Sequence, residues 1–311
     1  MRNKKVLITG SEGFVGKHLV ERLIKEGYNV YTLQRTINET PSIINRVIQL
    51  QADIRQWAQI RKLFIQNNFD ICFHLASQAL VEQGVKNPRK TLKTNVEGTW
   101  NILEAARISD VERVILASTS HVYGNNTQLP YKEYYIPRPS RIYETSKTCA
   151  DIIAQTYITT YKMPIFIPRF TNIYGPGDMN FTRIIPKTIK NIHENKNLKI
   201  WGEGIVRDYL YIDDAIDAYI KLINFDPKKI RNYIFNFGGH SKVTTLDLVN
   251  LIMQLSGKKN IKVEIITDSR RNEIKEQYVS SDKAKKILQW KPTYTLEEGL
   301  TRTIKWYRKQ V

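Results

Sequence analysis

The chain begins with three patterns in immediate succession: a buried strand, a glycine loop and an amphipathic helix. Residues 5–9 are a short apolar run, residues 10–16 read Gly-Ser-Glu-Gly-Phe-Val-Gly, and apolar residues keep helical spacing from residue 14 to residue 25. Glycines at this spacing allow a tight turn and close approach of the backbone to a pyrophosphate, which then lies at the helix N-terminus. Because the loop joins a strand to a helix, it predicts a dinucleotide-binding βαβ unit. The loop residues that we expect at the cofactor are Gly10, Gly13, Phe14, Val15 and Gly16.

Strands and helices alternate through the first half of the chain. Further apolar strand patterns occur at residues 29–33, 47–51, 71–75, 113–117 and 164–167, with helical patterns between them at 57–66, 89–108 and 143–161. This alternation is typical of a parallel sheet that helices cover on both faces. We therefore predict an α/β fold, with a doubly wound parallel sheet of the Rossmann type over residues 1–171.

The alternation changes after about residue 170. Short strand patterns occur at 198–201 and 233–237, and helical patterns at 184–192, 213–223, 244–255, 281–288 and 296–308. We expect residues 172–311 to form mainly a smaller α/β substrate-binding domain. Part of 205–240 is expected to return to the first domain.

The charge of the chain is strongly positive, with 48 Lys and Arg against 30 Asp and Glu among 311 residues and a net charge of +18. The longest basic runs are pairs and no nucleic-acid motif occurs, so we interpret the charge as solvated surface and expect no nucleic-acid partner. No run of about 18 apolar residues occurs, so we expect no membrane span. The two cysteines are far apart in the sequence and form no disulfide framework, so we expect a cytoplasmic protein. We also expect no metal site.

The end of the second strand indicates which dinucleotide binds. A carboxylate there would bind the ribose 2′-hydroxyl of NAD, whereas an arginine favours the 2′-phosphate of NADP. This chain has Gln34-Arg35, which favours NADP over NAD, although Glu12 would repel that phosphate and Arg35 could be an ordinary surface charge. Asp53, after the third strand, could accept a hydrogen bond from the adenine amino group or simply start a turn.

A Tyr-x-x-x-Lys pair, Tyr143 and Lys147, lies in the helix expected at 143–161. Residues four apart share one helix face, so the ammonium can lower the pKa of the phenol from about 10 toward neutrality and make Tyr143 a general base. Lys147 could also bind the nicotinamide ribose. Such pairs occur in ordinary amphipathic helices, but behind a glycine loop and parallel strands we interpret this one as catalytic.

Hydroxyl groups and a histidine follow the strand expected at 113–117, where residues 118–124 read Ser-Thr-Ser-His-Val-Tyr-Gly. Ligands of open α/β sheets bind at such carboxyl ends. We expect Thr119 to donate a hydrogen bond to a substrate oxygen beside Tyr143. The alternative is a loop whose hydroxyl groups cap its own backbone.

Together these motifs resemble the extended short-chain dehydrogenase/reductases, in the NAD(P)-dependent nucleotide-sugar epimerase/dehydratase family. The similarity covers nearly the whole chain and includes the sequences at 74–77 (His-Leu-Ala-Ser), 94–99 (Thr-Asn-Val-Glu-Gly-Thr), 169–177 (Arg-Phe-Thr-Asn-Ile-Tyr-Gly-Pro-Gly), 207–209 (Arg-Asp-Tyr) and 290–292 (Trp-Lys-Pro). Residues 146–151, 177–183 and 276–280 look most like the branch of CDP-glucose and GDP-mannose 4,6-dehydratases.

The resemblance also implies binding residues and an assembly. Further cofactor contacts are implied at Ile54, Leu75, Ala76, Ser77 and Asn95. Asn172 and Arg207 match positions that hold the diphosphate of a nucleotide sugar. Because arginine suits bidentate phosphate recognition, the next candidates are Arg183, Arg270 and Arg271. Family members dimerise through the helix that carries the catalytic tyrosine and the helix before it, so a homodimer is expected.

The reaction implied by the resemblance starts with oxidation at C4 of the sugar. Tyr143, aided by Thr119 and Lys147, removes the O4 proton while the C4 hydride passes to the nicotinamide. Hydride return to the opposite face of the 4-keto sugar gives a 4-epimer. Loss of water across C5–C6 with hydride return to C6 gives a 4-keto-6-deoxy sugar. In related reductases the hydride runs the other way, onto a keto sugar.

Ser120 and His121 bear on the choice between these reactions. Many dehydratases of the family have Asp-Glu at this place, so the pair in this chain departs from their pattern and counts against dehydration, but two arguments favour it. Imidazole carries protons well at neutral pH, and its bulk would obstruct the rotation that an epimerase needs. We therefore favour a 4,6-dehydratase over a 4-epimerase; the alternative for His121 is a histidine that only orders the loop. The alternative of a different class is a protein that binds a dinucleotide without catalysis. Such a protein would be expected to have lost one of the catalytic residues, whereas Thr119, Tyr143 and Lys147 are all present in this chain.

Overall fold

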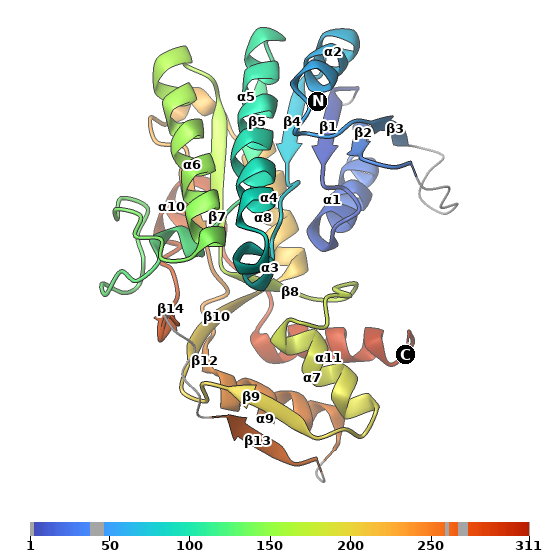
Figure 1. The fold of residues 1–311 in the computed structure, drawn as a ribbon, viewed down its shortest axis with the longest axis vertical. Helices are drawn as coiled ribbons and strands as arrows, with labels where there is room; N and C mark the ends of the chain where they lie inside the picture. The colour runs from blue at the N-terminus through green and yellow to red at the C-terminus, as the bar shows by residue number, and fades with distance from the viewer. Residues whose placement is uncertain (1–2, 38–46, 259–260, 267–272, 311) are drawn as a thin grey trace. The chain divides into compact units, whose positions relative to one another are not determined.

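A computed structural model describes residues 3–37, 47–258, 261–266 and 273–310 (Figure 1). The chain divides into two compact units. The first unit contains residues 1–125, 135–169 and 216–235, and the second contains 126–134, 170–215 and 236–311. Each unit is described by itself.

A parallel sheet runs through the first unit in the order β11-β7-β5-β4-β1-β2-β3, with the short β6 beside β7. Its strands are β1 (Lys5–Thr9), β2 (Asn29–Gln34), β3 (Val47–Gln51), β4 (Ile71–His74), β5 (Arg113–Leu116), β6 (Ser118–Thr119), β7 (Ile165–Phe170) and β11 (Ile234–Phe237). β1 pairs in parallel with β2 on one side and with β4 on the other. The chain therefore crosses over β1 between β3 and β4, and ligands bind at such a reversal of strand order.

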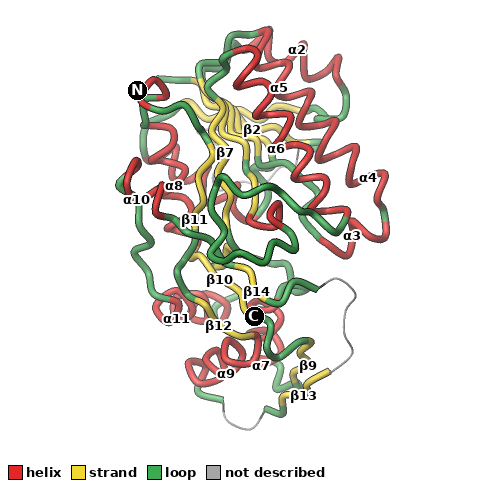
Figure 2. The backbone as a smooth tube through the Cα atoms, turned by 90° about the vertical axis from the view of Figure 1, so that its left-hand side faces the viewer, coloured by secondary structure: helices red, strands yellow, loops and turns green. Residues whose placement is uncertain are grey.

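Helices cover both faces of this sheet, as Figure 2 shows for α5 and α6 on one side and α8 on the other. The helices are α1 (Phe14–Lys25), α2 (Trp57–Asn67), α3 (Val81–Lys86), α4 (Pro88–Leu92), α5 (Gly98–Ile108), α6 (Ile142–Tyr161) and α8 (Ile212–Asn224), with single turns at Lys93–Glu97, Ser120–Tyr123 and Pro227–Lys229. This arrangement confirms the predicted doubly wound α/β fold.

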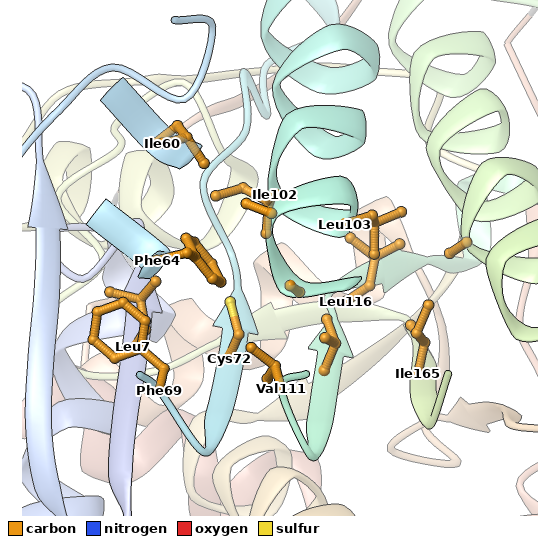
Figure 3. Close-up of a cluster of buried hydrophobic side chains, with 14 of the residues drawn as sticks. Leu7, Ile60, Phe64, Phe69, Cys72, Ile102, Leu103, Val111, Leu116 and Ile165 are labelled. Carbon is orange, nitrogen blue, oxygen red and sulfur yellow. The ribbon is translucent and has the colours of Figure 1, made fainter. Parts of the chain in front are cut away.

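A continuous apolar core lies between the sheet and the helices on one face (Figure 3). Strand residues such as Leu7 and Cys72 pack against Phe64 of α2 and Ile102 and Leu103 of α5, and all five side chains are buried. Burial of each large apolar side chain contributes about 1.5–3 kcal/mol. This core fixes the strands, and with them the loops at their carboxyl ends.

The helix expected over 89–108 is interrupted by a π-helical turn at Lys93–Glu97, between α4 and α5. Asn95 lies in this turn, and its side chain accepts a hydrogen bond from the Gln78 backbone N–H (2.7 Å) and donates one to the Gln78 carbonyl (2.9 Å). These two bonds tie the turn to the segment that contains Gln78. π-helical turns are frequent at functional sites.

Among its described residues, the second unit contains two small sheets and four helices. The larger sheet has the order β12-β10-β14, with β8 also paired to β10, and the smaller joins β13 to β9. Its strands are β8 (Asn172–Tyr174), β9 (Leu198–Trp201), β10 (Val206–Tyr211), β12 (Lys242–Thr244), β13 (Val263–Ile266) and β14 (Glu276–Gln277). Its helices are α7 (Ile184–His193), α9 (Thr245–Ser256), α10 (Asp282–Leu288) and α11 (Leu296–Tyr307).

Candidate active site

The glycine loop forms a compact turn between β1 and α1. Gly10 has a φ of +73°, and its carbonyl accepts a hydrogen bond from the Gly13 N–H at 3.1 Å. A Cβ atom at Gly16 would lie 2.2 Å from the Gly10 carbonyl oxygen, so no larger residue fits there. The Ser11 hydroxyl is buried and has no hydrogen-bond partner among the residues described. This cradle of backbone N–H groups at the start of α1 fits the phosphates of a dinucleotide.

The loop after β4 packs against the glycine loop. A Cβ at Gly10 would lie 2.7 Å from the Ala76 nitrogen, and that N–H donates to the Thr9 hydroxyl at 3.1 Å. The neighbouring Leu75 N–H donates to the Thr9 carbonyl. The structure thus brings the expected cofactor residues Leu75 and Ala76 to the glycine loop, and Ser77 follows directly.

His74, at the end of β4, links three elements. Its Nδ1 lies 2.7 Å from the Thr9 hydroxyl and its Nε2 lies 3.1 Å from the Thr99 hydroxyl. Burial, with the charge of Lys147, lowers the pKa of His74 to about 3. His74 is therefore neutral at physiological pH and holds β1, β4 and α5 in register.

Arg35 and Asp53, which are expected to contact the adenosine part of the dinucleotide, differ in their surroundings. Arg35 is exposed at the end of β2. Asp53 accepts hydrogen bonds from the Arg55 side chain, including one of 2.5 Å, and from the Arg55 N–H at 3.0 Å. The hydrogen bonds from the Arg55 side chain are the main cause of a lowered pKa of Asp53. Asp53 thus forms a turn before α2, next to Ile54, which lies 2.7 Å from the Cβ that Gly98 lacks.

Tyr143 and Lys147 lie on the first two turns of α6. The Lys147 side chain is buried, and its ammonium donates to the Ala117 carbonyl at 2.7 Å. Burial lowers the pKa of Lys147 to about 8, against an opposing effect of Asp151. Lys147 therefore carries a charge close to the phenol-bearing turn of the helix at neutral pH. Asn95 donates to the Ser146 hydroxyl at 2.9 Å and so connects this helix to the π-helical turn.

The segment after β5 presents Thr119 and His121 and buries Ser120. The Thr119 hydroxyl accepts from the His121 N–H at 3.3 Å and starts the turn Ser120–Tyr123. The His121 ring lies edge to face with Tyr143, with 6.0 Å between the ring centres. Ser120 is only 2% exposed, so of the predicted pair His121 is the group available for chemistry.

Sequence reasoning missed a buried ion pair behind Lys147. Arg169 of β7 donates from Nε to one oxygen of Asp151 (2.9 Å) and from a terminal nitrogen to the other (2.8 Å). Asp151 also accepts from the Ser118 hydroxyl at 2.8 Å, and Arg169 donates to the Tyr123 hydroxyl. The sequence indicated only that Asp151 shares a helix face with Lys147, because it follows four residues later; it did not indicate the partner, Arg169.

The expected diphosphate residues lie in the second unit. Asn172 and Arg207 are on the adjacent strands β8 and β10, where the Asn172 amide donates to the Asp208 carbonyl. The Arg207 guanidinium forms an ion pair with Glu273 (2.7 Å), and Arg183 forms one with Asp178 (3.0 Å). The remaining two candidates, Arg270 and Arg271, lie outside the described residues.

Metal ligands and membrane spans concern residues 3–37, 47–258, 261–266 and 273–310, which the structure describes. Within those ranges, no group of three or more His, Cys, Asp or Glu side chains could hold a metal ion. Among the helices described there, none is both long and apolar enough to cross a membrane.

Comparison with known proteins identifies the family. The model of the NAD dependent epimerase/dehydratase family matches residues 6–238. The chain belongs to this family. The predicted resemblance to extended short-chain dehydrogenases/reductases is therefore confirmed, and this member of the epimerase/dehydratase family is an enzyme.

Relatives of this epimerase/dehydratase family member fall into both reaction classes. The UDP-glucuronate 4-epimerase of Thermodesulfobacterium geofontis is 30% identical over 98% of this chain and 96% of its own length. The dTDP-glucose 4,6-dehydratase 1 of Escherichia coli is 30% identical over 97% and 92%. The UDP-glucuronic acid 4-epimerase of Bacillus cereus, solved with UDP-glucuronic acid and NAD, has a TM-score of 0.88 at 28% identity, covering 99% of this chain and 100% of that one. The choice between the two reactions therefore rests on the site.

Proposed function

We propose that this enzyme is a nucleotide-sugar 4,6-dehydratase, which oxidises C4 transiently and eliminates water across C5–C6 to give a 4-keto-6-deoxy sugar. One observation carries the proposal: the His121 imidazole lies beside the Tyr143 ring, where an epimerase needs open space for the keto sugar to turn. Imidazole both accepts and donates protons near neutral pH.

The glycine loop fits NAD or NADP, because its backbone N–H groups at the start of α1 suit a pyrophosphate and Gly16 lets the loop pack closely on that helix. Asn95 and the 75–77 loop line the same edge of the sheet, and Lys147 would hold the nicotinamide ribose. The bound nicotinamide would supply the hydride acceptor at C4 and the later hydride donor.

Tyr143 is the general base for the first step. It takes the proton from O4 as the C4–O4 single bond becomes a carbonyl. The Lys147 ammonium stabilises the phenolate form electrostatically, and the Thr119 hydroxyl donates a hydrogen bond to O4. Oxidation at C4 acidifies the proton on C5, which prepares the elimination.

His121 then transfers one proton within the substrate. The neutral imidazole removes the C5 proton, and the imidazolium donates it to the C6 hydroxyl group. That group leaves as water while the C5=C6 double bond forms, which returns His121 to its neutral state. Hydride return to C6 then requires a proton at C5, and the proton that Tyr143 took from O4 balances this step. The buried Ser120 has no part in this transfer, so a single group does what two acidic residues do in many dehydratases.

Arg207 and Asn172 are proposed to bind the diphosphate of the nucleotide sugar. The guanidinium of Arg207 already forms an ion pair with one anion, Glu273, and a guanidinium also suits a phosphate.

Arg35 is proposed to favour NADP over NAD, although Glu12 opposes this preference. The exposed guanidinium at the end of β2 suits the 2′-phosphate. The mass of the dinucleotide released on denaturation tests this directly, because NADP carries one phosphate more than NAD.

The first unit is also proposed to form a homodimer. Large side chains are exposed on α5 and α6: Trp100 (54%), Ile152 (50%) and Tyr161 (51%). Exposed aromatic and aliphatic residues on neighbouring helices are typical of an interface core.

The deciding experiment is incubation of the purified enzyme with UDP-, CDP-, dTDP- and GDP-sugars, followed by mass spectrometry and sugar analysis of the products. Loss of one water from a substrate supports the 4,6-dehydratase. An unchanged mass with inverted C4 would contradict it and establish the 4-epimerase, which the similarity to UDP-glucuronate 4-epimerases favours as the second candidate. A keto-sugar reductase would leave these sugars unchanged and would instead reduce a 4-keto-6-deoxy nucleotide sugar supplied together with reduced nicotinamide dinucleotide.

A further inference from the structure

Glu144, the residue directly after Tyr143, is a carboxylate with no exposed surface. Its two oxygens have different partners. Oε2 accepts from the Ser140 N–H (2.9 Å), the Ser140 hydroxyl (3.1 Å) and the Arg141 N–H (3.1 Å), and so caps the N-terminus of α6. Oε1 accepts from the Arg141 guanidinium, at 2.8 Å from Nε.

Oε1 also faces the ring of His121. The distance from Nδ1 to Oε1 is 3.7 Å, which is longer than a hydrogen bond but within the range of an ion pair. Burial alone would raise the pKa of Glu144, yet the interactions with His121, Ser140 and Arg141 lower it to about 2. Glu144 is therefore ionised at neutral pH, next to a ring that can carry a charge.

We propose that Glu144 positions His121: Oε1 orients the ring with an Nδ1–H toward α6 and favours the imidazolium, so that Nε2 exchanges the proton with the substrate. This inference rests on the proposed function for the use of that proton. The geometry itself is independent of the reaction. An anion close to one ring nitrogen stabilises the protonated ring, and the nitrogen that faces it becomes the donor.

Arg141 acts in the opposite direction. Its guanidinium binds the same oxygen, with a terminal nitrogen at 2.6 Å, and places a second positive charge near the imidazolium. The groups that face His121 from this helix and its N-cap are thus a phenol (Tyr143), a carboxylate (Glu144) and a guanidinium (Arg141). The carboxylate raises the proton affinity of His121, and the guanidinium lowers it.

Capping alone would not need this arrangement. A second capping box occurs at α11, where Glu298 accepts from the Thr295 N–H and hydroxyl, both at 2.9 Å, through Oε2. Glu298 is exposed, whereas Glu144 is completely buried beside His121. Glu298 therefore provides a control for the loss of a capping carboxylate without a nearby histidine ring.

The test is an NMR titration of the His121 ring signals in the purified full-length protein, assigned by their loss in His121→Ala. We expect Glu144→Gln to lower the pKa of His121 by roughly one unit, and Arg141→Gln to raise it by a smaller amount. Both substitutions keep hydrogen-bonding groups at the helix start. Glu298→Gln should leave the titration unchanged.

Opposite shifts support the proposal, because two substitutions in one capping box would move the signal together, or not at all, if the role were only structural. No shift in Glu144→Gln, or shifts of the same sign in both variants, would overturn it. If Glu144→Gln fails to fold, Arg141→Gln decides alone, since a lowered or unchanged pKa contradicts the proposal.

Product analysis of the same variants separates this inference from the proposed function. With opposite shifts and loss of water from the substrate, both stand, and the pH dependence of water loss should move in opposite directions in the two variants. With opposite shifts and a 4-epimer as product, the role of Glu144 toward His121 stands and the dehydratase assignment fails. With water loss but no shifts, the dehydratase stands and the role of Glu144 fails.

Discussion

Tyr143 and His121 lie with their rings edge to face, but their proton transfers belong to different steps of the proposed reaction. Tyr143 acts at O4 before the keto sugar exists, and His121 acts at C5 and C6 afterwards. Substitution of one residue should therefore leave the step of the other measurable.

His121→Ala should reduce water loss about 10²- to 10⁴-fold, because it removes the proton carrier of the elimination. Reduction of the bound cofactor on addition of substrate should persist, since Tyr143 and Lys147 are unchanged. Stopped-flow absorbance of the reduced nicotinamide and product mass measure the two steps separately. His193→Ala, on α7 of the second unit, is the matched control. Product formation at the wild-type rate by His121→Ala would remove this residue from the mechanism.

Lys147 predicts an alkaline limit for the first step. Because burial lowers the pKa of Lys147 to about 8, the ammonium is present below this pH and is lost as the pH rises through it. The single-turnover rate of cofactor reduction should therefore fall above about pH 8. Lys147→Arg should react more slowly, and its rate should not fall above about pH 8, because arginine keeps its charge. If the rate still falls near pH 8 in Lys147→Arg, the fall belongs to the titration of another group.

At the scale of helices and strands, the glycine loop controls how closely β1 approaches α1. Gly16→Ala places a Cβ 2.2 Å from the Gly10 carbonyl oxygen, and this backbone atom cannot move without opening the turn. We expect loss of most bound dinucleotide and a lowered melting temperature. Gly204→Ala is the control, since its Cβ would meet nothing within 4 Å. Normal cofactor content in Gly16→Ala would show that the turn adapts.

The pair of Asp151 and Arg169 joins α6 to β7 inside the first unit. Asp151→Asn leaves the Arg169 charge buried with a neutral partner, which should cost about 3–5 kcal/mol in the free energy of unfolding. Glu104→Gln breaks the half-exposed pair with Arg107 and should cost at most about 1 kcal/mol. Urea unfolding of both variants measures the difference. Equal small losses would mean that water reaches the Asp151 site.

The sheet of the first unit was predictable because parallel strands buried on both faces are continuous apolar runs. The expected ranges for β1, β3 and β9 agree with the structure to the residue. β10 escaped prediction because buried charged residues, Arg207 and Asp208, interrupt its apolar pattern. Its partners β8, β12 and β14 have only two or three residues each, too few for a periodicity.

The site was predictable where a motif has a fixed spacing, as in the glycine loop and the Tyr143–Lys147 pair. Long-range partners were not. The contacts of Asp151 with β7 and of Glu144 with His121 join residues 18 and 23 positions apart, and no local pattern encodes them. The π-helical turn at Lys93–Glu97 likewise contains Asn95, whose side chain exchanges hydrogen bonds with the backbone of Gln78, outside that helix.

At the scale of the whole molecule, the exposed face of α5 and α6 predicts the state of assembly. Trp100 donates from its indole to the Tyr157 hydroxyl at 3.0 Å, so this large side chain is held in place although it is 54% exposed. A fixed aromatic residue on the surface loses little conformational entropy on association. Such residues often contribute most of the binding energy of an interface.

Trp100→Glu should therefore convert a dimer into a monomer, because it places a charge in the centre of an apolar contact. Light scattering coupled to size-exclusion chromatography measures the mass directly. Trp57→Glu is the matched control, since Trp57 is also exposed (39%) but lies on α2. A dimer that persists in Trp100→Glu, or a monomeric wild-type protein, would contradict assembly through α5 and α6. A monomeric Trp57→Glu would move the interface to α2.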